Sequence, residues 1–199
     1  MYNSILRVND KVKKIDDLYF KNYGGANYTK NYQLYTKPAE YIIQDLLDKN
    51  IYFHTLLDIG CASGELVRDL RRLGVDAYGI ENNEDILKKC VVPKYCLHLD
   101  MDNLEQLPLT KFDIIYTNSM MYCFPQNVLN TLQKMHNICQ KAVCFYNPFL
   151  KECSFKDPYR VFLASRIWWE KQFEEANFKS LGKDVYAKIY FAENNLNSL

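Results

Sequence analysis

The chain has 199 residues, of which 48% are hydrophobic, and a formal net charge of +1 at pH 7; this suits one domain with a full core and neither requires nor excludes a nucleic-acid partner. No apolar run approaches the roughly 18 residues of a membrane span, and residues 1–17 lack the apolar core of a secretory signal. Because the 7 cysteines form no Cys-x-x-Cys pair and are odd in number, we expect free thiols in a reducing, cytoplasmic protein.

The rest of the chain alternates between helical and strand-like patterns. Residues 37–49 place apolar side chains at helical spacing, with a proline near their start, and predict a helix. Short apolar runs then predict strands at 55–59, 77–81, 95–99, 112–117 and 141–146. Helical patterns lie between and after them, at 64–73, 85–90, 127–139 and 165–176. This alternation predicts an α/β fold, with helices on both faces of a mostly parallel sheet, and residues 178–191 predict an antiparallel C-terminal hairpin.

The loop after the first of these strands reads Asp58-Ile-Gly-Cys-Ala-Ser-Gly64. A dinucleotide-binding Gly-x-Gly-x-x-Gly loop needs a glycine where this chain has Glu65, and a P-loop needs a lysine after its last glycine. The spacing that remains, Gly60, Ala62 and Gly64, favours a cofactor whose carboxylate meets free N–H groups at the helix start. An ordinary strand-to-helix turn is the alternative explanation of the two glycines.

Polar residues follow the next three strands at the same edge of the predicted sheet. Glu81, at the end of the second strand, is placed to accept hydrogen bonds from two ribose hydroxyls, as an acid does in NAD-binding proteins too. Asp100 can accept a proton from an exocyclic amine while Met101 flanks the base, although acids are also common in solvated loops. Asn118 and Ser119 end the fourth strand beside the same crevice. Together they predict a nucleoside-containing ligand.

Taken in order, the loop 58–64, Glu81, Asp100 and the run "FDIIYTNSMMY" resemble the class I S-adenosylmethionine-dependent methyltransferases. The resemblance covers residues 16 to about 191. It implies a Rossmann-like sheet of seven strands that binds S-adenosyl-L-methionine and releases S-adenosyl-L-homocysteine.

Two segments outside the sheet extend the resemblance. The aromatic run at 19–32 looks like the N-terminal segment of small methyltransferases in the methyltransferase-11/12/23-like group, and residues 157–178 are similar to the segment after their fifth strand. The organisation that this implies is an aromatic cap, a methyltransferase domain and a short tail, at residues 1–36, 37–193 and 194–199.

The resemblance also implies a role for individual residues by matching position. The residues expected to surround the cofactor are Asp58, Gly60, Cys61, Ala62, Gly64, Glu81, Asn82, Asp100, Met101, Asn118, Ser119, Tyr19, Tyr23 and Tyr28. The chain departs from the family pattern in two places. Ala62 replaces the middle glycine of the loop, and Arg160 stands where the family segment carries a histidine. No metal site is predicted.

The reaction that the resemblance implies needs little from the protein beyond position, because the sulfonium is already an activated electrophile. The protein has to align the lone pair of an acceptor with the methyl group and to exclude water. The candidates for direct participation are Tyr122, Asp157 and Arg160, the last of which pairs either with an anionic acceptor or with nearby acids. The three histidines are expected to be packed or surface residues.

The acceptor is expected to be a small molecule, methylated on oxygen or nitrogen, because no additional domain is available for a larger substrate. One alternative is an RNA or protein methyltransferase, in which Lys11–Lys14 and the arginines of the 64–73 helix guide a polyanion. The other is a non-catalytic methyltransferase-like binding partner, which the two departures at Ala62 and Arg160 suggest. The oligomeric state has no signal in the sequence.

Overall fold

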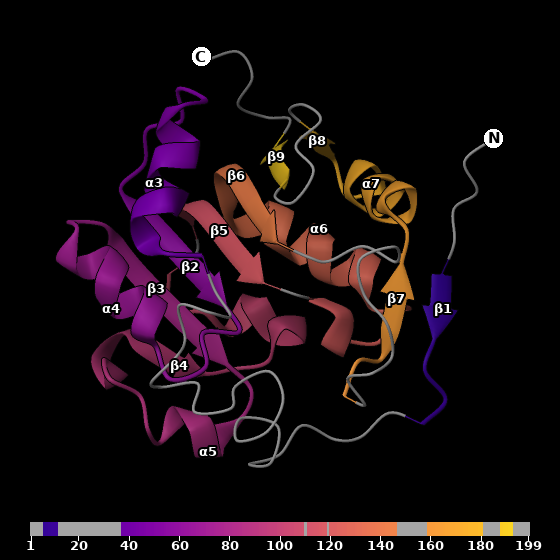
Figure 1. The fold of residues 1–199 in the computed structure, drawn as a ribbon, viewed down its shortest axis with the longest axis horizontal. Helices are drawn as coiled ribbons and strands as arrows, with labels where there is room; N and C mark the ends of the chain where they lie inside the picture. The colour runs from indigo at the N-terminus through magenta and orange to yellow at the C-terminus, as the bar shows by residue number, and fades with distance from the viewer. Residues whose placement is uncertain are drawn as a thin grey trace.

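A seven-stranded sheet with the order β4-β3-β2-β5-β6-β9-β8 organises the molecule (Figure 1). This computed structural model describes residues 6–11, 37–109, 111–118, 120–146, 159–180 and 188–192. The strands of the sheet are β2 (Thr55–Ile59), β3 (Asp76–Glu81), β4 (Cys96–His98), β5 (Phe112–Asn118), β6 (Cys139–Tyr146), β8 (Phe178–Ser180) and β9 (Lys188–Ala192). The strands from β4 to β6 pair in parallel, whereas β9 pairs antiparallel with both β6 and β8. The predicted mostly parallel sheet and its antiparallel C-terminal hairpin are confirmed.

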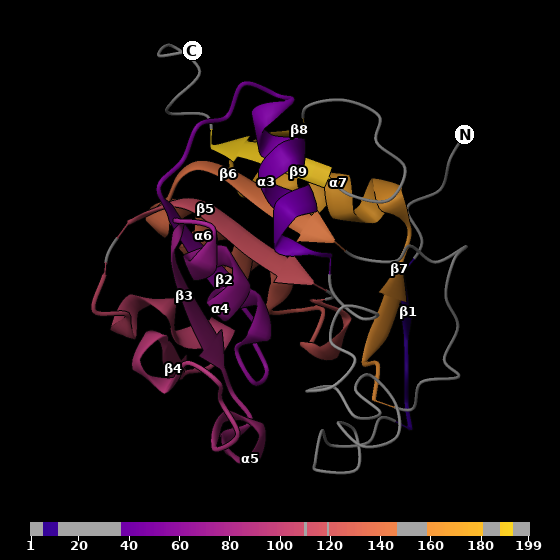
Figure 2. The same ribbon diagram turned by 60° about the vertical axis from the view of Figure 1, so that its left-hand side comes forward.

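Helices cover both faces of the sheet, as predicted (Figure 2). The helices that cover one face are α3 (Ala39–Leu47) and α4 (Glu65–Arg72), and those that cover the other are α6 (Val128–Ile138) and α7 (Arg166–Glu175). The shorter helices are α5 (Glu84–Leu87), η2 (Pro93–Tyr95), η3 (Met101–Gln106) and η4 (Met120–Tyr122). Among the helices of the described residues, none has the length and apolar character that crossing a membrane requires.

The central strand β5 shows why the sequence adopts this arrangement. Phe112–Thr117 are all buried, because a parallel strand with helices on both faces has no side that meets water. Successive side chains point to opposite faces, so Ile115 joins the core beneath α6 and α7, while Ile114 and Tyr116 join the core beneath α3 and α4. A continuous apolar run of this length, without alternating polar residues, therefore predicts a strand that is buried on both faces.

Two features differ from the sequence prediction. Helix α5 ends at Leu87 rather than at residue 90, since the chain turns away and the N–H of Val91 donates to the carbonyl of Ser63 at 2.9 Å. A second, two-stranded sheet pairs β1 (Leu6–Val8) antiparallel with β7 (Phe162–Ala164). The side chains of β1 are all exposed, so β1 lacked the alternating pattern by which a half-buried strand is recognised.

Asp113 fixes the start of β2 at the amino edge of the sheet. Its carboxylate accepts hydrogen bonds from the main-chain N–H groups of His54 (2.7 Å) and Thr55 (3.2 Å) and pairs with the ammonium of Lys141 at 3.0 Å. Burial raises the pKa of Asp113, but the hydrogen bonds and the Lys141 charge outweigh it, so the pKa lies below its ordinary value.

Asp113→Asn is expected to lower the free energy of unfolding by about 1–3 kcal/mol near pH 7, because the amide keeps one acceptor oxygen and no charge. A depressed folded-state pKa means that this stability is present above the unfolded pKa of about 3.9 and is lost as the pH falls through the folded value. Urea unfolding of both proteins near pH 7 and near pH 3 should therefore show a smaller difference at the lower pH. A difference that does not change with pH would contradict this assignment.

Candidate functional site

The loop between β2 and α4 lies at the carboxyl edge of the sheet and has an unusual backbone. Gly60, Ala62 and Gly64 all have positive φ angles, of 82°, 49° and 76°. The N–H groups of Gly60 and Cys61 both donate to the carbonyl of Ile80, at 2.9 and 3.0 Å, which ties the loop to β3. The i, i+2, i+4 spacing in the sequence therefore corresponds to a left-handed conformation at every second residue. At Ala62 this conformation costs about 1–2 kcal/mol, a cost that a glycine at the same position would not have.

The two glycines of the loop have different surroundings. A Cβ atom added to Gly60 would meet no atom of the described residues within 4 Å, so these residues leave the loop open on that side. At Gly64 the same atom would lie 2.9 Å from the sulfur atoms of both Cys90 and Cys96 and 3.2 Å from Val92. Gly60 therefore leaves space beside the main chain for a ligand, whereas Gly64 is required both by its dihedral angle and by close packing.

Glu81 joins the loop to the end of β3. Its carboxylate accepts from the N–H of Ala62 through Oε2 at 3.0 Å and from the N–H of Asn83 through Oε1 at 2.9 Å. Burial raises the pKa of Glu81, although hydrogen bonds from Asn83 and Ala62 act in the opposite direction. Since each carboxylate oxygen has two acceptor positions, both oxygens keep capacity for donors from a ligand.

Asp58 is a buried acid at the same edge, on the face of the sheet covered by α3 and α4. Only 4% of its surface is exposed. Burial, together with the neighbouring groups of Cys96 and Glu81, raises the pKa of Asp58 well above its ordinary value. The charged form of a buried carboxyl group is stabilised most by a nearby cation, so the position of Asp58 suits the ammonium group of a ligand.

Asp100 and Asn82 are brought together beyond the ends of β3 and β4. The amide of Asn82 donates to Oδ2 of Asp100 at 3.0 Å, and Oδ1 of Asp100 accepts from the N–H of Asp102 at 2.9 Å. Met101 is half-buried and packs against the core beneath α6 and α7. The acid and the apolar neighbour that the sequence predicts are thus adjacent, at the start of η3.

Asp102, in contrast, has a structural role. Its carboxylate accepts from Nδ2 of Asn127 at 3.0 Å and from Oγ1 of Thr131 at 2.6 Å, and its carbonyl accepts from Lys134. These contacts attach η3 to the start of α6, so this acid holds the segment of Met101 in place.

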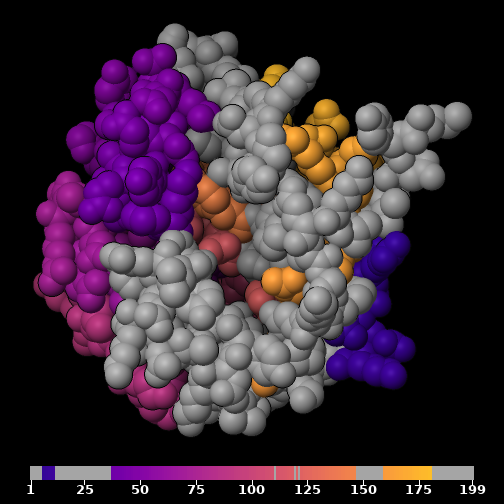
Figure 3. Space-filling model, in the orientation of Figure 1, coloured from indigo at the N-terminus to yellow at the C-terminus, as the bar shows by residue number. Residues whose placement is uncertain are grey.

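The residues predicted for the acceptor side come from the end of β5 and from the chain beyond it. Asn118 is exposed at the end of β5 and lies opposite Tyr146 in the sheet register. Tyr122 is half-buried at the end of η4, which packs against β7, and half-buried Arg160 lies two residues before that strand. Figure 3, in the orientation of Figure 1, shows atoms in the colours of β5 and β6 near the middle of the molecule, beside those of α3. The remaining predicted site residues lie outside the described residues: Tyr19, Tyr23, Tyr28, Ser119 and Asp157.

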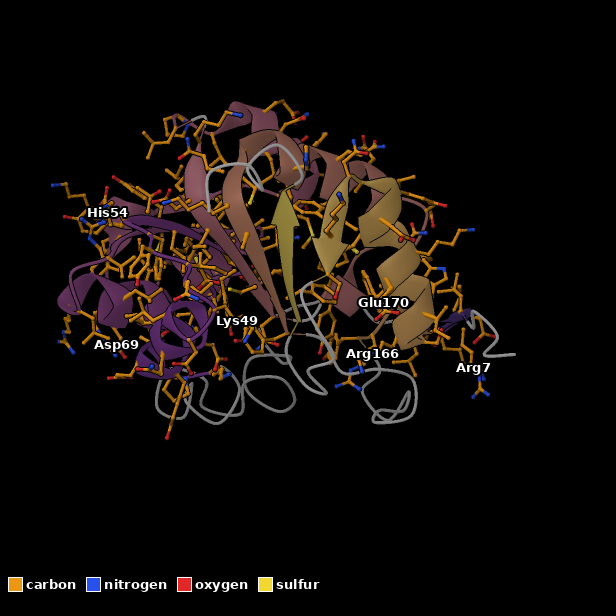
Figure 4. The ribbon with its side chains drawn as sticks, turned by 90° about the horizontal axis from the view of Figure 1, so that it is seen from above. Arg7, Lys49, His54, Asp69, Arg166 and Glu170 are labelled. Carbon is orange, nitrogen blue, oxygen red and sulfur yellow. The ribbon has the colours of Figure 1, made fainter. Side chains whose placement is uncertain are left out.

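The three histidines have the surroundings expected of surface and packing residues. His54 is exposed and lies at the amino edge of the sheet, on the outside of the molecule (Figure 4). His98 is exposed on β4, and its Nε2 lies 3.1 Å from the carbonyl of Asn82. His136 packs edge-on against the ring of Phe178, with 5.1 Å between ring centroids.

Sequence reasoning missed a polar cluster that includes Tyr146 and Lys37. The hydroxyl of Tyr146 donates to Asp45 at 3.2 Å, and the ammonium of Lys37 contacts both Asp45 and that hydroxyl. Burial, together with nearby Cys144 and Asp45, raises the pKa of Tyr146. The available signal was the position of Tyr146 at the carboxyl end of a predicted strand, where polar side chains reach a ligand.

Gly79 was also missed. A Cβ atom there would lie 2.6 Å from the sulfur of Cys61 and 3.0 Å from Val67. A glycine inside a strand often marks such a close approach, here of the loop and α4 to β3. Gly79→Ala is therefore expected to destabilise the protein by about 1–3 kcal/mol through overpacking, measured by urea unfolding. A variant as stable as the wild type would contradict the close approach.

Comparison with known proteins places this geometry in a family. A family model described as a methyltransferase domain matches residues 30–181, whereas a search of curated proteins finds no significant match. Among solved structures, a protein from Pyrococcus horikoshii OT3 is 16% identical, with a TM-score of 0.68 over 90% of this chain and 100% of its own.

Two further structures carry functional names. A SAM-dependent methyltransferase from Archaeoglobus fulgidus is 17% identical, with a TM-score of 0.63 over 85% of this chain and 100% of its own. Magnesium protoporphyrin IX methyltransferase from Synechocystis, crystallised with bound SAM, is 14% identical, with a TM-score of 0.59 over 85% of this chain and 83% of its own. At these identities the structural matches establish the fold, and the family model covers most of the chain. The chain belongs to the methyltransferase domain family, with the class I fold of S-adenosylmethionine-dependent methyltransferases.

Proposed function

We propose that this protein transfers a methyl group from S-adenosyl-L-methionine to an oxygen or nitrogen atom of a small molecule. The observation that carries the proposal is the position of Glu81, whose buried carboxylate holds the left-handed loop and keeps acceptor capacity on both oxygens. A ribose presents two adjacent hydroxyl donors to such a group. The neighbouring open side of Gly60 leaves room for the methionine part of the cofactor.

The residues around Glu81 fit the other parts of the cofactor. Asp58 is buried beside Cys96 and Glu81, neither of which carries a positive charge, so it suits the ammonium group of the methionine part. Asp100 and Met101, adjacent at the start of η3, suit the amine and the face of adenine. When bound, the cofactor supplies an activated methyl group.

The chain's own contribution to the reaction is to position the acceptor beside Asn118 and to exclude water. Tyr122 ends η4, Arg160 lies two residues before β7, and η4 and β7 are in contact, so we assign both residues to the acceptor side. A guanidinium at Arg160 suits an acceptor that carries a carboxylate or phosphate. Asp157 and the aromatic residues Tyr19, Tyr23 and Tyr28 stay proposed members of the site.

A small acceptor is favoured over RNA because the arginines of α4 already have acidic partners. Arg68 pairs with Asp69 at 2.7 Å, and Arg71 pairs with Asp76 at 2.6 Å while stacking 3.5 Å from the ring of Tyr95. These pairs reduce the positive potential that a polyanion needs. Binding to a mixed-sequence RNA near 50 mM salt is therefore expected to be undetectable, and tight, steeply salt-dependent binding would instead support an RNA substrate.

The function is tested in two steps. Calorimetry with S-adenosylhomocysteine should show binding at one site per chain, and labelled S-adenosylmethionine should transfer its methyl group to members of a small-molecule acceptor panel. Absence of cofactor binding would contradict the proposal. Binding without turnover on a broad panel would favour the non-catalytic alternative.

Asp58→Asn is expected to weaken the binding of S-adenosylhomocysteine about tenfold or more while stabilising the free protein by about 1–2 kcal/mol near pH 7.5. The raised pKa means that the folded state favours the protonated carboxyl, so the stability that Asp58 contributes is full below the unfolded pKa of about 3.9 and is lost as the pH rises through the folded value. The side-chain amide of the variant carries no charge, so the variant does not lose this stability as the pH rises. Urea unfolding and calorimetry measure the two effects, and a variant that is less stable but binds normally would contradict the assignment.

A further inference from the structure

Two cysteines, Cys90 and Cys96, lie together beneath the cofactor loop, which itself contains Cys61. The sulfur atoms of Cys90 and Cys96 are both 2.9 Å from the position that a Cβ atom of Gly64 would take. Cys61 and Cys96 are buried members of the core beneath α3 and α4, and Cys90 packs against that core. Cys96 is the first residue of β4. All three are free thiols.

The cluster extends from a partly exposed thiol to the loop. Cys61 and Cys96 are buried, with 2% and 6% of their surface exposed, whereas Cys90 is half-buried in the turn after α5. The residue that follows it, Val91, donates its N–H to the carbonyl of Ser63 in the loop, at 2.9 Å. A displacement of Cys90 would therefore also displace Val91 and disturb its hydrogen bond to the loop that ends at Gly64.

We propose that Cys90 and Cys96 are a modification site, at which a small-molecule disulfide converts them to a reversible disulfide that weakens cofactor binding. In the first step, the thiolate of accessible Cys90 attacks the small disulfide, forming a mixed disulfide and releasing one thiol. The thiolate of Cys96 then attacks the Cys90 sulfur, forming the Cys90–Cys96 bond and releasing the second thiol. Two protein thiols are oxidised, and one small disulfide is reduced to two thiols.

The two thiols differ in pKa. Burial raises the pKa of Cys90 to about 11, so the first step proceeds through a small thiolate fraction and is fastest at alkaline pH. The surroundings of Cys96 suit the attacking role in the second step, because interaction with the Cys61 side chain lowers the pKa of Cys96 and outweighs burial together with the other neighbouring groups.

The disulfide is expected to disturb the cofactor loop, and this part of the inference rests on the proposed function. A disulfide requires about 2.05 Å between the two sulfur atoms, so the turn at Cys90 has to move toward β4. Val91 moves with it, and its hydrogen bond to Ser63 is strained or lost. Gly64 packs against both sulfur atoms, so the left-handed end of the loop cannot keep its position.

The test compares reduced protein with protein treated with oxidised glutathione. Peptide mapping without reductant is expected to find a Cys90–Cys96 cross-link, with a mass loss of about 2 Da per chain. Calorimetry is expected to show at least about tenfold weaker S-adenosylhomocysteine binding in the oxidised protein, restored by dithiothreitol. Cys90→Ser should keep its affinity after the same treatment. Cys139→Ser, which removes a buried thiol at the amino end of β6, should respond like the wild type.

The outcomes separate this inference from the proposed function. A cross-linked protein that binds S-adenosylhomocysteine as tightly as the reduced form would overturn the inference, as would the absence of the Cys90–Cys96 peptide. Failure of the reduced protein to bind S-adenosylhomocysteine would instead contradict the proposed function, whatever the peptide map shows.

Discussion

Glu81→Ala is expected to bind S-adenosylhomocysteine about a hundredfold or more weakly than the wild-type protein. Hydrogen bonds to a charged acceptor contribute about 1.5–3 kcal/mol each, and the variant loses two such bonds to the ribose. It also leaves the N–H groups of Ala62 and Asn83 without the acceptors that hold the loop on β3. Titration calorimetry of both proteins measures the ratio of dissociation constants.

Glu84→Ala provides a matched control for this result. It removes the same type of charge close by in the sequence, but Glu84 is exposed in the first turn of α5, and its pair with Lys88 at 3.5 Å is of a kind that contributes little. Its affinity should equal that of the wild type. Glu81→Gln should lie between the two, because the amide keeps one acceptor oxygen. If Glu81→Ala and Glu84→Ala bind equally well, Glu81 does not hold the ribose.

Gly64→Ala is expected to lower the free energy of unfolding by about 2–5 kcal/mol and to abolish measurable cofactor binding. A left-handed alanine costs about 1–2 kcal/mol, and contacts at 2.9 Å with the sulfur atoms of buried Cys96 and half-buried Cys90 add an overpacking cost of about 1–3 kcal/mol. The new methyl group can be accommodated only if Cys90, Cys96 or the loop moves. Urea unfolding and calorimetry measure the two effects.

Two other glycines isolate the causes. Gly60→Ala and Gly74→Ala add a Cβ atom at positive φ angles of 82° and 90°, and neither new atom lies within 4 Å of another atom in the part of the chain that the structure describes. Both should therefore lose only the conformational cost of about 1–2 kcal/mol. Gly60→Ala should also weaken S-adenosylhomocysteine binding, because its open side faces the proposed ligand, whereas Gly74→Ala should not. Equal stability losses in Gly64→Ala and Gly74→Ala would show that the cysteines do not restrict the loop.

The part of the site that could be predicted from the sequence is the part built from local signals. The strand Thr55–Ile59, the glycines at positions 60 and 64 and the helix that follows them are adjacent in the chain, so periodicity and glycine spacing are sufficient. Glu81 is predictable for a related reason. In a parallel sheet, the residue that ends the next strand lies at the same edge as the loop.

The parts that could not be predicted depend on contacts between distant segments. The exposed strand Leu6–Val8 becomes a strand only by pairing with Phe162–Ala164. The thiols of Cys90 and Cys96 converge because the turn after α5 and the start of β4 meet beneath Gly64, and no spacing motif records this. The same holds for Tyr146, whose partners Lys37 and Asp45 lie far away in the chain. Sequence patterns report periodicity, whereas these clusters follow from the topology of the sheet.

The central claim, that the loop after β2 and Glu81 hold the cofactor, is tested most directly by a crystal structure with S-adenosylhomocysteine. We predict both ribose hydroxyls within hydrogen-bonding distance of the Glu81 carboxylate, the homocysteine part beside Gly60 and the adenine beside Met101. Ligand density elsewhere on the protein, or a ribose that makes no contact with Glu81 at saturating ligand, would contradict this account.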